Sequence, residues 1–363
     1  MTGMNKVGVG IIGSGFVANL HMEAFKLVHN AEVVAVASIM DDQVRAFADT
    51  HHIPQVFHDY QQMLELPEID LVTLAVHNFL HAEACIAAAR AGKHVIGEKP
   101  LAVTLEEADS MIEECRRNGV KLMYAEELCF APKYVRAKTL VDDGALGRLY
   151  MVKQSEKHSG PHSPWFWDME KSGGGAVLDM GCNAFQFFRW VMGNMPVKSV
   201  YASMGTYMHA DKTQGEDNAV IIVTFQDGTL CVCETSLAKL VGMDDRAELY
   251  GTGGVVYADL LIGSSLLTYS ESGYGYAVEK ASTTTGWTFT MFEETWNYGF
   301  PQEMQHFTDC VMYDRQPLVT GEDGRAVLEM IYAAYASAGR GAPVDLPFYS
   351  EARKPIDLWK KPS

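Results

Sequence analysis

The chain has 363 residues, of which 48% are hydrophobic and 21% are charged. This length exceeds the size at which a single hydrophobic core usually stops growing, and the composition is typical of a folded globular protein, so a disordered chain, a collagen-like repeat and a small disulfide-stapled module are excluded. The formal net charge of −17, with no compensating run of Lys or Arg, excludes a broad surface for nucleic acid or for an anionic membrane.

The lack of a recognisable targeting pattern and the arrangement of the cysteines both favour a reducing compartment. The chain shows neither a signal-peptide pattern nor eighteen consecutive apolar residues, which favours a cytoplasmic location. Its seven cysteines are scattered and odd in number, which indicates reduced thiols. Cys231 and Cys233 share one face of a predicted strand, but a metal site there needs two further ligands, so we expect no metal.

The first third of the chain alternates between predicted strands and predicted helices. Short apolar runs predict strands at 7–12, 33–37, 71–76, 94–96 and 120–124. Apolar residues at helical spacing predict helices at 16–28, 42–50, 80–91 and 104–118, and Thr104 with Glu107 forms a capping box at the start of the last one. Repeated alternation with short connections predicts a parallel, doubly wound sheet.

The pattern changes after about Pro132. Strand-like segments then follow one another at 149–157, 200–207, 219–225, 229–235 and 247–251, with a strong hairpin signal at Asp227 and Gly228. Helices are expected after Asp179 and at 302–312 and 323–338. We therefore expect an α/β protein with a Rossmann domain at 1–130 and an α+β domain at 131–363, built on a large, mostly antiparallel open sheet.

A glycine motif joins the first predicted strand to the first predicted helix. Gly13, Gly15 and Ala18 fit the G-x-G-x-x-G/A pattern. The first glycine permits a tight turn, the second lets the backbone approach a pyrophosphate, and the small third residue allows close packing of helix on sheet. We therefore predict a dinucleotide site at Gly13, Gly15, Phe16 and Val17.

In such folds, the residues at the end of the second strand determine whether NAD or NADP binds. Ser38 lies where a ribose-binding carboxylate is expected, and no basic residue follows before Arg45. A 2′-phosphate would therefore lack a counter-charge, which favours NAD over NADP. Asp41 either reaches the ribose or caps the following helix.

Several segments along nearly the whole chain carry a family resemblance. They are the glycine motif followed by His21, AGKHVIGEKP at 91–100, GGGAVLDMG at 173–181, and TGEDGRA at 320–326 with PVDLP at 343–347. Together they resemble the Gfo/Idh/MocA oxidoreductases, the family of glucose-fructose oxidoreductase and inositol dehydrogenase. The resemblance implies NAD(P)-dependent hydride transfer on sugars or cyclitols, and an open sheet used to form homo-oligomers.

The resemblance also assigns roles to residues of the first domain. Lys99, in the Glu-Lys-Pro segment, is expected to bind the reacting oxygen and to contact the cofactor, with Glu98 holding it in place. Asn78 and His81 are expected to touch the cofactor. Glu126 or Glu127, after the strand at 120–124, is a candidate for substrate contact.

The second catalytic element of the family is Asp-x-x-x-His. Here Asp179 is followed by Asn183 where the histidine is expected, and an amide does not take a proton near neutral pH. His158 and His162, in a loop with Trp165 and Asp168, are alternative proton acceptors and sugar contacts. Asn183 is then expected to bind a hydroxyl.

The leading hypothesis is an NAD-dependent dehydrogenase that acts on a secondary hydroxyl of a sugar, glycoside or cyclitol, or on the corresponding ketone. One alternative is a glycoside-processing enzyme that oxidises its substrate transiently and retains NAD. The other, motivated by Asn183, is a protein that binds NAD and sugar without turnover.

Overall fold

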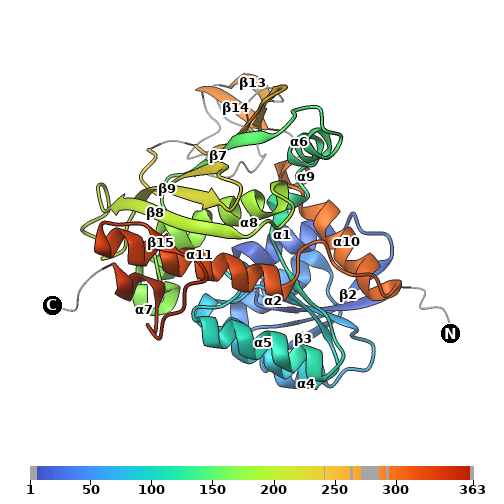
Figure 1. Cartoon of the computed structure of the whole chain (residues 1–363). Helices are drawn as coiled ribbons and strands as arrows, with labels where there is room; N and C mark the ends of the chain where they lie inside the picture. The colour runs from blue at the N-terminus through green and yellow to red at the C-terminus, as the bar shows by residue number, and fades with distance from the viewer. Residues whose placement is uncertain (1–5, 241, 262–264, 271–285, 292–293, 360–363) are drawn as a thin grey trace. The chain divides into compact units, whose positions relative to one another are not determined.

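The computed structural model describes residues 6–240, 242–261, 265–270, 286–291 and 294–359, and the chain divides into two compact units (Figure 1). Unit 1 comprises Met1–Phe130 and Gly299–Leu328, and unit 2 comprises Ala131–Tyr298 and Glu329–Ser363. The sequence predicts an unbroken second domain at 131–363, whereas the segment Gly299–Leu328 groups with unit 1.

Unit 1 is built on a six-stranded sheet in which every neighbouring pair is parallel, in the order β3-β2-β1-β4-β5-β6. The strands are β1 (Val7–Ile12), β2 (Ala31–Ala37), β3 (Gln55–Phe57), β4 (Leu71–Leu74), β5 (His94–Gly97) and β6 (Leu122–Tyr124). The doubly wound sheet is therefore confirmed. The three-residue strand β3 was not predicted, and β4 ends two residues earlier than predicted.

Helices follow most strands of unit 1. They are α1 (Phe16–Phe25), α2 (Asp41–His51), α3 (Tyr60–Leu64), α4 (His81–Arg90), α5 (Leu105–Arg117), α10 (Phe300–Met312) and the start of α11 (Gly321–Arg340), with short 3₁₀ turns η1 (Asn78–Leu80) and η2 (Glu127–Cys129). The strand order reverses beside β1, so right-handed crossovers place the helices of the two halves on opposite faces. In Figure 1, α4 and α5 accordingly lie on the other side of β2 and β3 from α1 and α10.

Local signals in unit 1 behave as the sequence predicts. Both hydrogen bonds of the capping box are present, with Glu107 N donating to Thr104 Oγ1 and Thr104 N donating to Glu107 Oε2, each at 3.0 Å. Every residue of β1 is buried, because helices cover both faces of a parallel sheet.

Unit 2 is built on a seven-stranded sheet in the order β12-β11-β7-β10-β9-β8-β15. The strands are β7 (Leu149–Lys157), β8 (Val197–Gly205), β9 (Asn218–Phe225), β10 (Leu230–Ser236), β11 (Asp244–Gly251), β12 (Val255–Asp259) and β15 (Val344–Asp345); β13 (Ser265–Ser270) and β14 (Gly286–Met291) form a separate antiparallel pair. All neighbours in the large sheet are antiparallel except β7 and β10. The mostly antiparallel sheet and the hairpin at Asp227 and Gly228 are confirmed.

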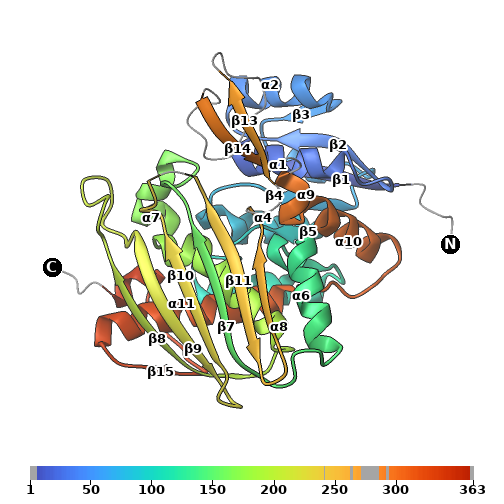
Figure 2. The same cartoon turned by 90° about the horizontal axis from the view of Figure 1, so that it is seen from above.

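Helices of unit 2 lie behind this sheet in Figure 2, where α8 (Cys182–Val191) and the end of α11 are seen beyond the strands. The other helices of the unit are α6 (Pro132–Asp142), η3 (Pro164–Trp167), α7 (Met169–Ser172), α9 (Glu294–Tyr298) and η5 (Pro355–Leu358). One turn of π-helix, η4 (Val177–Gly181), leads directly into α8. π-Helical turns are rare in proteins as a whole, and those that occur are often found at functional sites.

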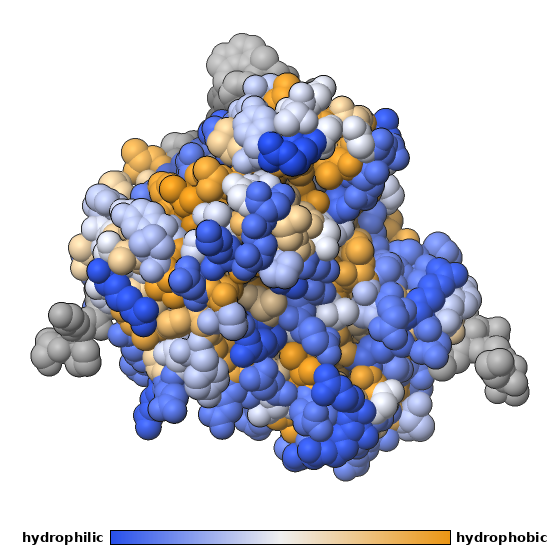
Figure 3. All heavy atoms as spheres, in the orientation of Figure 1, coloured by the Kyte–Doolittle hydropathy of each residue, from blue (hydrophilic) through white to orange (hydrophobic). Residues whose placement is uncertain are grey.

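The opposite face of this sheet carries exposed apolar side chains. Tyr201, Val220 and Ile222 on β8 and β9 are exposed, and in Figure 3 hydrophobic residues gather over the region of these strands. Among the described residues, no helix has the length and apolar character that crossing a bilayer requires.

Candidate functional site

The glycine loop of unit 1 has the conformation that a dinucleotide turn requires. Gly13 has φ +110°, and a Cβ there would lie 2.0 Å from the carbonyl oxygen of Ala75, so no other residue fits. A Cβ at Gly15 would meet no described atom within 4 Å, which leaves open space above the backbone. Ala18 is fully buried where α1 packs on the sheet.

A polar atom without a partner also lies in this loop. The hydroxyl oxygen of Ser14 is buried and has no hydrogen-bond partner among the described residues. Gln43 Nε2 donates to the carbonyl oxygen of Ser14 at 2.8 Å and thereby fixes the loop from α2. Helix α1 starts directly after Gly15, and the first N–H groups of a helix have no intrahelical acceptor. The residues present therefore fit a bound pyrophosphate.

Ser38 and Asp41 lie beyond the end of β2. Ser38 is half-buried, and its Oγ accepts a long hydrogen bond from Met40 N. Asp41 is the first residue of α2 and does not cap it. Its Oδ1 lies 2.7 Å from Arg45 Nε and 3.3 Å from His58 Nε2, and the hydrogen bond from Arg45 lowers the pKa of Asp41. Asp41 is therefore ionised, and it pairs with Arg45 and lies beside His58.

A chain of hydrogen bonds fixes the backbone of Lys99 at the carboxyl end of β5. Thr73 Oγ1 lies 2.7 Å from His21 Nδ1, and His21 Nε2 lies 2.7 Å from Glu98 Oε1. The other carboxylate oxygen of Glu98 accepts from Lys99 N at 3.0 Å. Thr73, His21 and Glu98 are buried, and Lys99 is half-buried.

Glu98 keeps its charge in this setting. Burial by itself raises the pKa of Glu98, but the hydrogen bond from His21 and the charges of His21 and Lys99 together bring the pKa below its ordinary value. A buried carboxylate in turn favours the charged form of the cation beside it. The charged Glu98 therefore fixes the backbone of Lys99 at the edge of the sheet where ligands bind in open α/β folds.

The predicted cofactor contacts after β4 take two different positions. Asn78 is buried at the start of η1. His81 is buried with Nδ1 2.9 Å from the carbonyl oxygen of Pro100 and Nε2 3.2 Å from that of Val76, and burial lowers its pKa. Its ring therefore ties the turn after β4 to the turn that follows Lys99.

A buried carboxyl that the sequence analysis did not single out for chemistry lies beside the end of β6. Glu303 Oε1 on α10 accepts from Glu126 N at 2.7 Å, while Oε2 is buried without a partner among the described residues. Burial, and then the negative charges of Glu127 and Glu98, raise the pKa of Glu303 well above its ordinary value. Burial therefore favours the neutral form of Glu303, and its hydrogen bond to Glu126 N fixes the turn that carries the candidate Glu127.

In unit 2, two residues at the end of β7 face two residues one helical turn apart. Asn183 Nδ2 donates to Glu156 Oε2 at 2.9 Å, and His158 Nε2 lies 4.0 Å from Asp179 Oδ2. Two residues along a strand span about 6.6 Å, and four residues along an α-helix span about 6 Å, so the two pairs match in spacing. All four side chains are buried.

The neighbours of His158 define which nitrogen is basic. Nδ1 lies 2.8 Å from the carbonyl oxygen of Gly160, an acceptor only, so in the neutral ring Nδ1 carries the proton. Nε2 then presents its lone pair on the side of Asp179. This arrangement allows the ring to accept a proton at Nε2, with the carboxylate stabilising the resulting imidazolium.

The remaining predicted residues of unit 2 differ in exposure. The His162 ring lies 5.3 Å from that of His158 and is exposed, whereas Trp165 is half-buried against a small apolar cluster. Asn183 is only 1% exposed, and its amide oxygen accepts from Cys182 Sγ at 3.2 Å. Both ends of the Asn183 amide are therefore engaged within the protein.

A second buried carboxyl, Glu216, holds the π-helix that carries Asp179. Glu216 Oε1 accepts from Val177 N at 2.9 Å and from Tyr335 Oη at 2.7 Å, while Oε2 is buried without a partner among the described residues. A Cβ at Gly175 would lie 2.0 Å from the carbonyl oxygen of Glu216. Burial raises the pKa of Glu216 to about 7.

Replacing Glu216 with glutamine is expected to flatten the pH dependence of stability. The pKa is higher in the folded chain than in the unfolded one, so the contribution of Glu216 to the free energy of unfolding falls by roughly 3 kcal/mol as pH rises from about 4.5 to 7. Glu216→Gln keeps the acceptor for Val177 and does not ionise. Thermal melts at about pH 5 and pH 8 check this, with a variant of the exposed Glu351, Glu351→Gln, as control. If Tm falls by the same amount from pH 5 to pH 8 in Glu216→Gln as in the wild type, the prediction is contradicted.

Cys231 and Cys233, the two cysteines that share a strand, are poorly suited to bind a metal ion. Cys231 and Cys233 are buried, and burial raises the pKa of both thiols far above the ordinary value. Among the described residues no group of three or more His, Cys, Asp or Glu side chains is arranged to hold a metal ion.

Comparison with known proteins identifies the family. The model of the oxidoreductase family with an NAD-binding Rossmann fold matches residues 7–126, and the model of the GFO/IDH/MocA C-terminal domain matches residues 134–257. The chain belongs to the Gfo/Idh/MocA oxidoreductase family. The predicted family, fold class and oxidoreductase class are thereby confirmed.

Individual relatives cover almost the whole chain. It is 28% identical over 331 residues to myo-inositol 2-dehydrogenase of Thermotoga maritima, which covers 91% of this chain and 95% of the relative. It is 26% identical to the NAD⁺-dependent scyllo-inositol 2-dehydrogenase of Bacillus subtilis, with 94% and 97% covered. Among solved structures, GenD2 from gentamicin A biosynthesis, in complex with NAD, has a TM-score of 0.89 at 28% identity, with 95% and 97% covered.

Proposed function

We propose that this protein is an NAD-dependent dehydrogenase that moves a hydride between the nicotinamide and a secondary hydroxyl or ketone of a sugar, glycoside or cyclitol. The observation that carries the proposal is the ionised, buried Glu98 that fixes Lys99 at the sheet edge shared with the glycine loop. The inositol dehydrogenases among the relatives support this substrate class.

Lys99 prepares the hydroxyl for oxidation in this proposal. Its ammonium donates a hydrogen bond to the substrate oxygen and stabilises the negative charge that develops as the proton leaves. Glu98 keeps Lys99 charged and His21 keeps Glu98 in place. The nicotinamide, when bound, supplies the hydride acceptor. Ser14, Phe16 and Val17 would hold the pyrophosphate side of the cofactor, while Asn78 and Glu98 would lie beside its nicotinamide half.

In this proposal, His158 of unit 2 is the base that accepts the proton of the substrate hydroxyl. It accepts the hydroxyl proton at Nε2, and Asp179 stabilises the ring once it is charged. Asn183 takes a positioning role through Glu156 rather than the hydroxyl contact that the sequence predicts, because both ends of its amide already have partners. His162, Trp165 and Glu127 are left as contacts to other parts of the substrate.

NAD is proposed over NADP because Asp41 already pairs with Arg45 and lies beside His58 beyond β2. Replacing Asp41 with asparagine would release Arg45 and His58 to pair with a 2′-phosphate. We expect Asp41→Asn to raise kcat/KM for NADP relative to NAD by about tenfold. The 2′-phosphate would gain a basic partner at the surface, and it would no longer be repelled by the Asp41 carboxylate. Initial rates with both cofactors measure this ratio, and an unchanged ratio would contradict the assignment.

A homo-oligomer that buries the outer face of the unit 2 sheet is also proposed. The exposed Tyr201, Val220 and Ile222 on adjacent strands support it, since a row of apolar side chains on a sheet favours association. Sedimentation equilibrium tests it, and a mass equal to the monomer at micromolar concentration would contradict it.

The function itself is tested with purified protein, NAD and a panel of inositols, aldoses and glycosides. We expect the absorbance band of reduced nicotinamide to grow with at least one member. Net release of NADH distinguishes this function from an enzyme that retains NAD through a cycle of oxidation and reduction. Tight binding of NAD and sugar without any reduced cofactor would instead favour a protein without turnover.

A further inference from the structure

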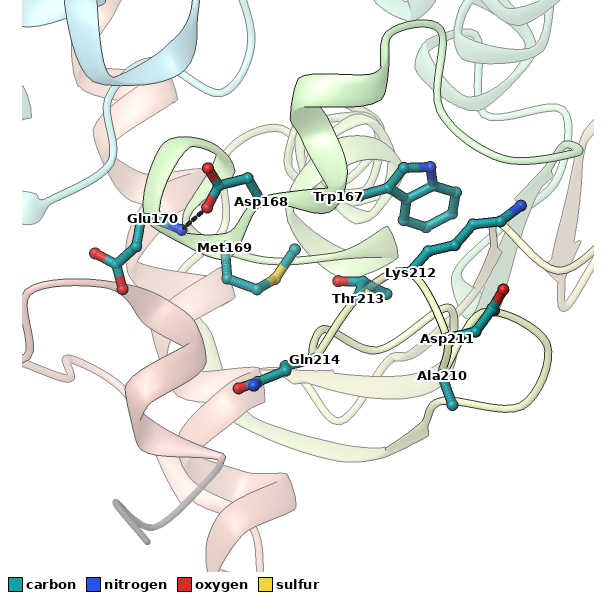
Figure 4. Close-up of a pocket in the computed structure, with 9 residues that line it drawn as sticks. All are labelled: Trp167, Asp168, Met169, Glu170, Ala210, Asp211, Lys212, Thr213 and Gln214. Atoms are coloured by element: carbon teal, nitrogen blue, oxygen red, sulfur yellow. Dashed lines mark hydrogen bonds between the residues drawn. The ribbon is translucent and has the colours of Figure 1, made fainter.

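A pocket of about 500 Å³ in unit 2 is lined by residues that have no role in the proposed function. One wall is the segment 167–170, at the end of η3 and the start of α7, and the other is the turn at 210–214 between β8 and β9. Figure 4 shows the Trp167 indole and the Lys212 side chain, from the two facing segments, on the right of the view, with Gln214 of the same turn as Lys212 at the lower left. The volume lies in the range of sites for small molecules.

The indole of Trp167 is held in a fixed position. A Cβ at Gly160 would lie 3.4 Å from a ring carbon of Trp167, so the glycine allows the indole to rest directly on the loop backbone. The ring also packs against a cluster of Phe166, Ala176, Met180 and Leu237. An aromatic wall that is already ordered binds a ligand at a small cost in conformational entropy.

Two polar groups border the same ring. The centre of the His209 ring lies 4.7 Å from that of Trp167, and Lys212 Nζ lies 6.0 Å from the centre of the Trp167 ring. His209 Nε2 is 3.1 Å from the carbonyl oxygen of Leu237. The pocket thus combines one aromatic wall with a lining that is otherwise mostly polar, a combination that suits a ring bearing many hydroxyl groups.

The charges around the pocket largely cancel. Asp168 accepts from Glu170 N at 3.0 Å and has Lys171 Nζ 3.4 Å from its other oxygen. Glu170 is paired with Lys354. The other two charged residues of the lining, Asp211 and Lys212, have opposite signs. This balance favours a neutral ligand over a phosphorylated or an amino-bearing one.

The pocket is connected to the proposed proton acceptor through two shared neighbours. The carbonyl oxygen of Leu237 accepts from Gly160 N at 2.9 Å, two residues after His158, and also lies against His209. Met180, in the cluster beneath Trp167, directly follows Asp179 in the π-helix. A ligand that contacts Trp167 would therefore lie close to one that contacts His158.

We propose that this pocket is a second sugar-binding subsite, and that the substrate is a neutral glycoside of at least two rings whose distal ring packs on Trp167. The proposal deepens the proposed function and rests on it for the carbohydrate class of the substrate. Lys212 donates hydrogen bonds to hydroxyl groups of that distal ring.

Equilibrium binding to the NAD-loaded protein tests the subsite. The probes are glucose, glucosamine, cellobiose, maltose and lactose, followed by saturation-transfer NMR and calorimetry. We expect at least one disaccharide to bind about tenfold more tightly than glucose, with saturation transfer to both of its rings. Trp167→Ala is expected to remove this advantage and to leave the affinity for glucose and for NAD within about twofold of wild type.

Two further variants keep the test decisive. Lys212→Met, which leaves the packed indole in place, is expected to weaken disaccharide binding about threefold if Trp167→Ala fails to fold. The exposed Tyr349→Ala is the control and is expected to bind as the wild type does. Equal binding of glucose and all three disaccharides, a full disaccharide preference in Trp167→Ala, disaccharide binding that Lys212→Met leaves unchanged, or a preference for glucosamine over glucose would overturn the proposal. Formation of NADH from single-ring substrates would survive each of those results, so failure of the subsite is distinguishable from failure of the proposed function.

Discussion

Replacing Lys99 with methionine is expected to lower kcat/KM by about a thousandfold on any substrate that the wild type oxidises. Methionine retains the length and apolar stem of lysine but has no donor for the reacting oxygen, and the loss of one such donor commonly costs two to three orders of magnitude. The Glu98 carboxylate would still accept from the backbone N–H at position 99. Steady-state kinetics with saturating NAD measure the loss.

A matched lysine provides the control for this experiment. Lys121 immediately precedes β6, at the amino end of the sheet, and pairs with the exposed Asp314 at 2.7 Å. We expect Lys121→Met to retain nearly all activity and Lys99→Met to bind NAD within a few-fold of wild type. More than a tenth of the wild-type kcat/KM in a folded Lys99→Met variant would exclude the proposed role of the ammonium.

Replacing His158 with glutamine is expected to lower kcat by one hundred to one thousandfold, or about 3 to 4 kcal/mol. A glutamine amide still donates to the carbonyl oxygen of Gly160, but it does not accept a proton near neutral pH. The acidic limb of the pH–kcat profile should disappear with the imidazole. Rates over the full pH range, in buffers of constant ionic strength, measure both effects.

The neighbouring His162 makes this experiment a choice between two histidines. Only His158 is buried with its Nε2 4.0 Å from Asp179, whereas His162 is exposed. We therefore expect His162→Gln to lower kcat by less than tenfold and to leave the shape of the pH profile unchanged. The reverse order of the two losses would assign the proton to His162.

Features encoded by neighbouring residues were predictable from the sequence. The turn at Gly13 and the capping box of Thr104 and Glu107 depend on contacts over a few residues, and both are present as expected. The hairpin at Asp227 and Gly228 is of the same kind. In each case the side chain or its absence determines the backbone conformation locally, so the pattern is sufficient.

Features that depend on distant residues were not predictable in this way. Thr73 on β4 and Glu98 after β5 are brought together by neighbouring parallel strands, and His21 meets both only because α1 packs on the sheet. The pairing of β7 with β10 is parallel within a mostly antiparallel sheet, and the return of Gly299–Leu328 to unit 1 leaves no local mark in the sequence.

The buried carboxyls show the same limit most clearly. Glu216 and Glu303 are two among 46 acidic residues, and nothing in their neighbouring residues distinguishes them from exposed ones. Their raised pKa values follow from burial, which arises only when α11 covers one and the end of β6 covers the other. The Asn183 amide is a further example, because Glu156, 27 residues earlier in the chain, meets it only in the fold.

Deuterium transfer tests the central claim most directly. The enzyme is given a sugar or inositol substrate that carries deuterium on its carbinol carbons. The nicotinamide cofactor is then recovered, and its mass is measured by mass spectrometry. Direct hydride transfer predicts reduced cofactor one mass unit heavier in the wild type, and about a thousandfold less of it with Lys99→Met. Reduced cofactor without deuterium, or equal deuterium transfer by the Lys99→Met variant, would contradict the account.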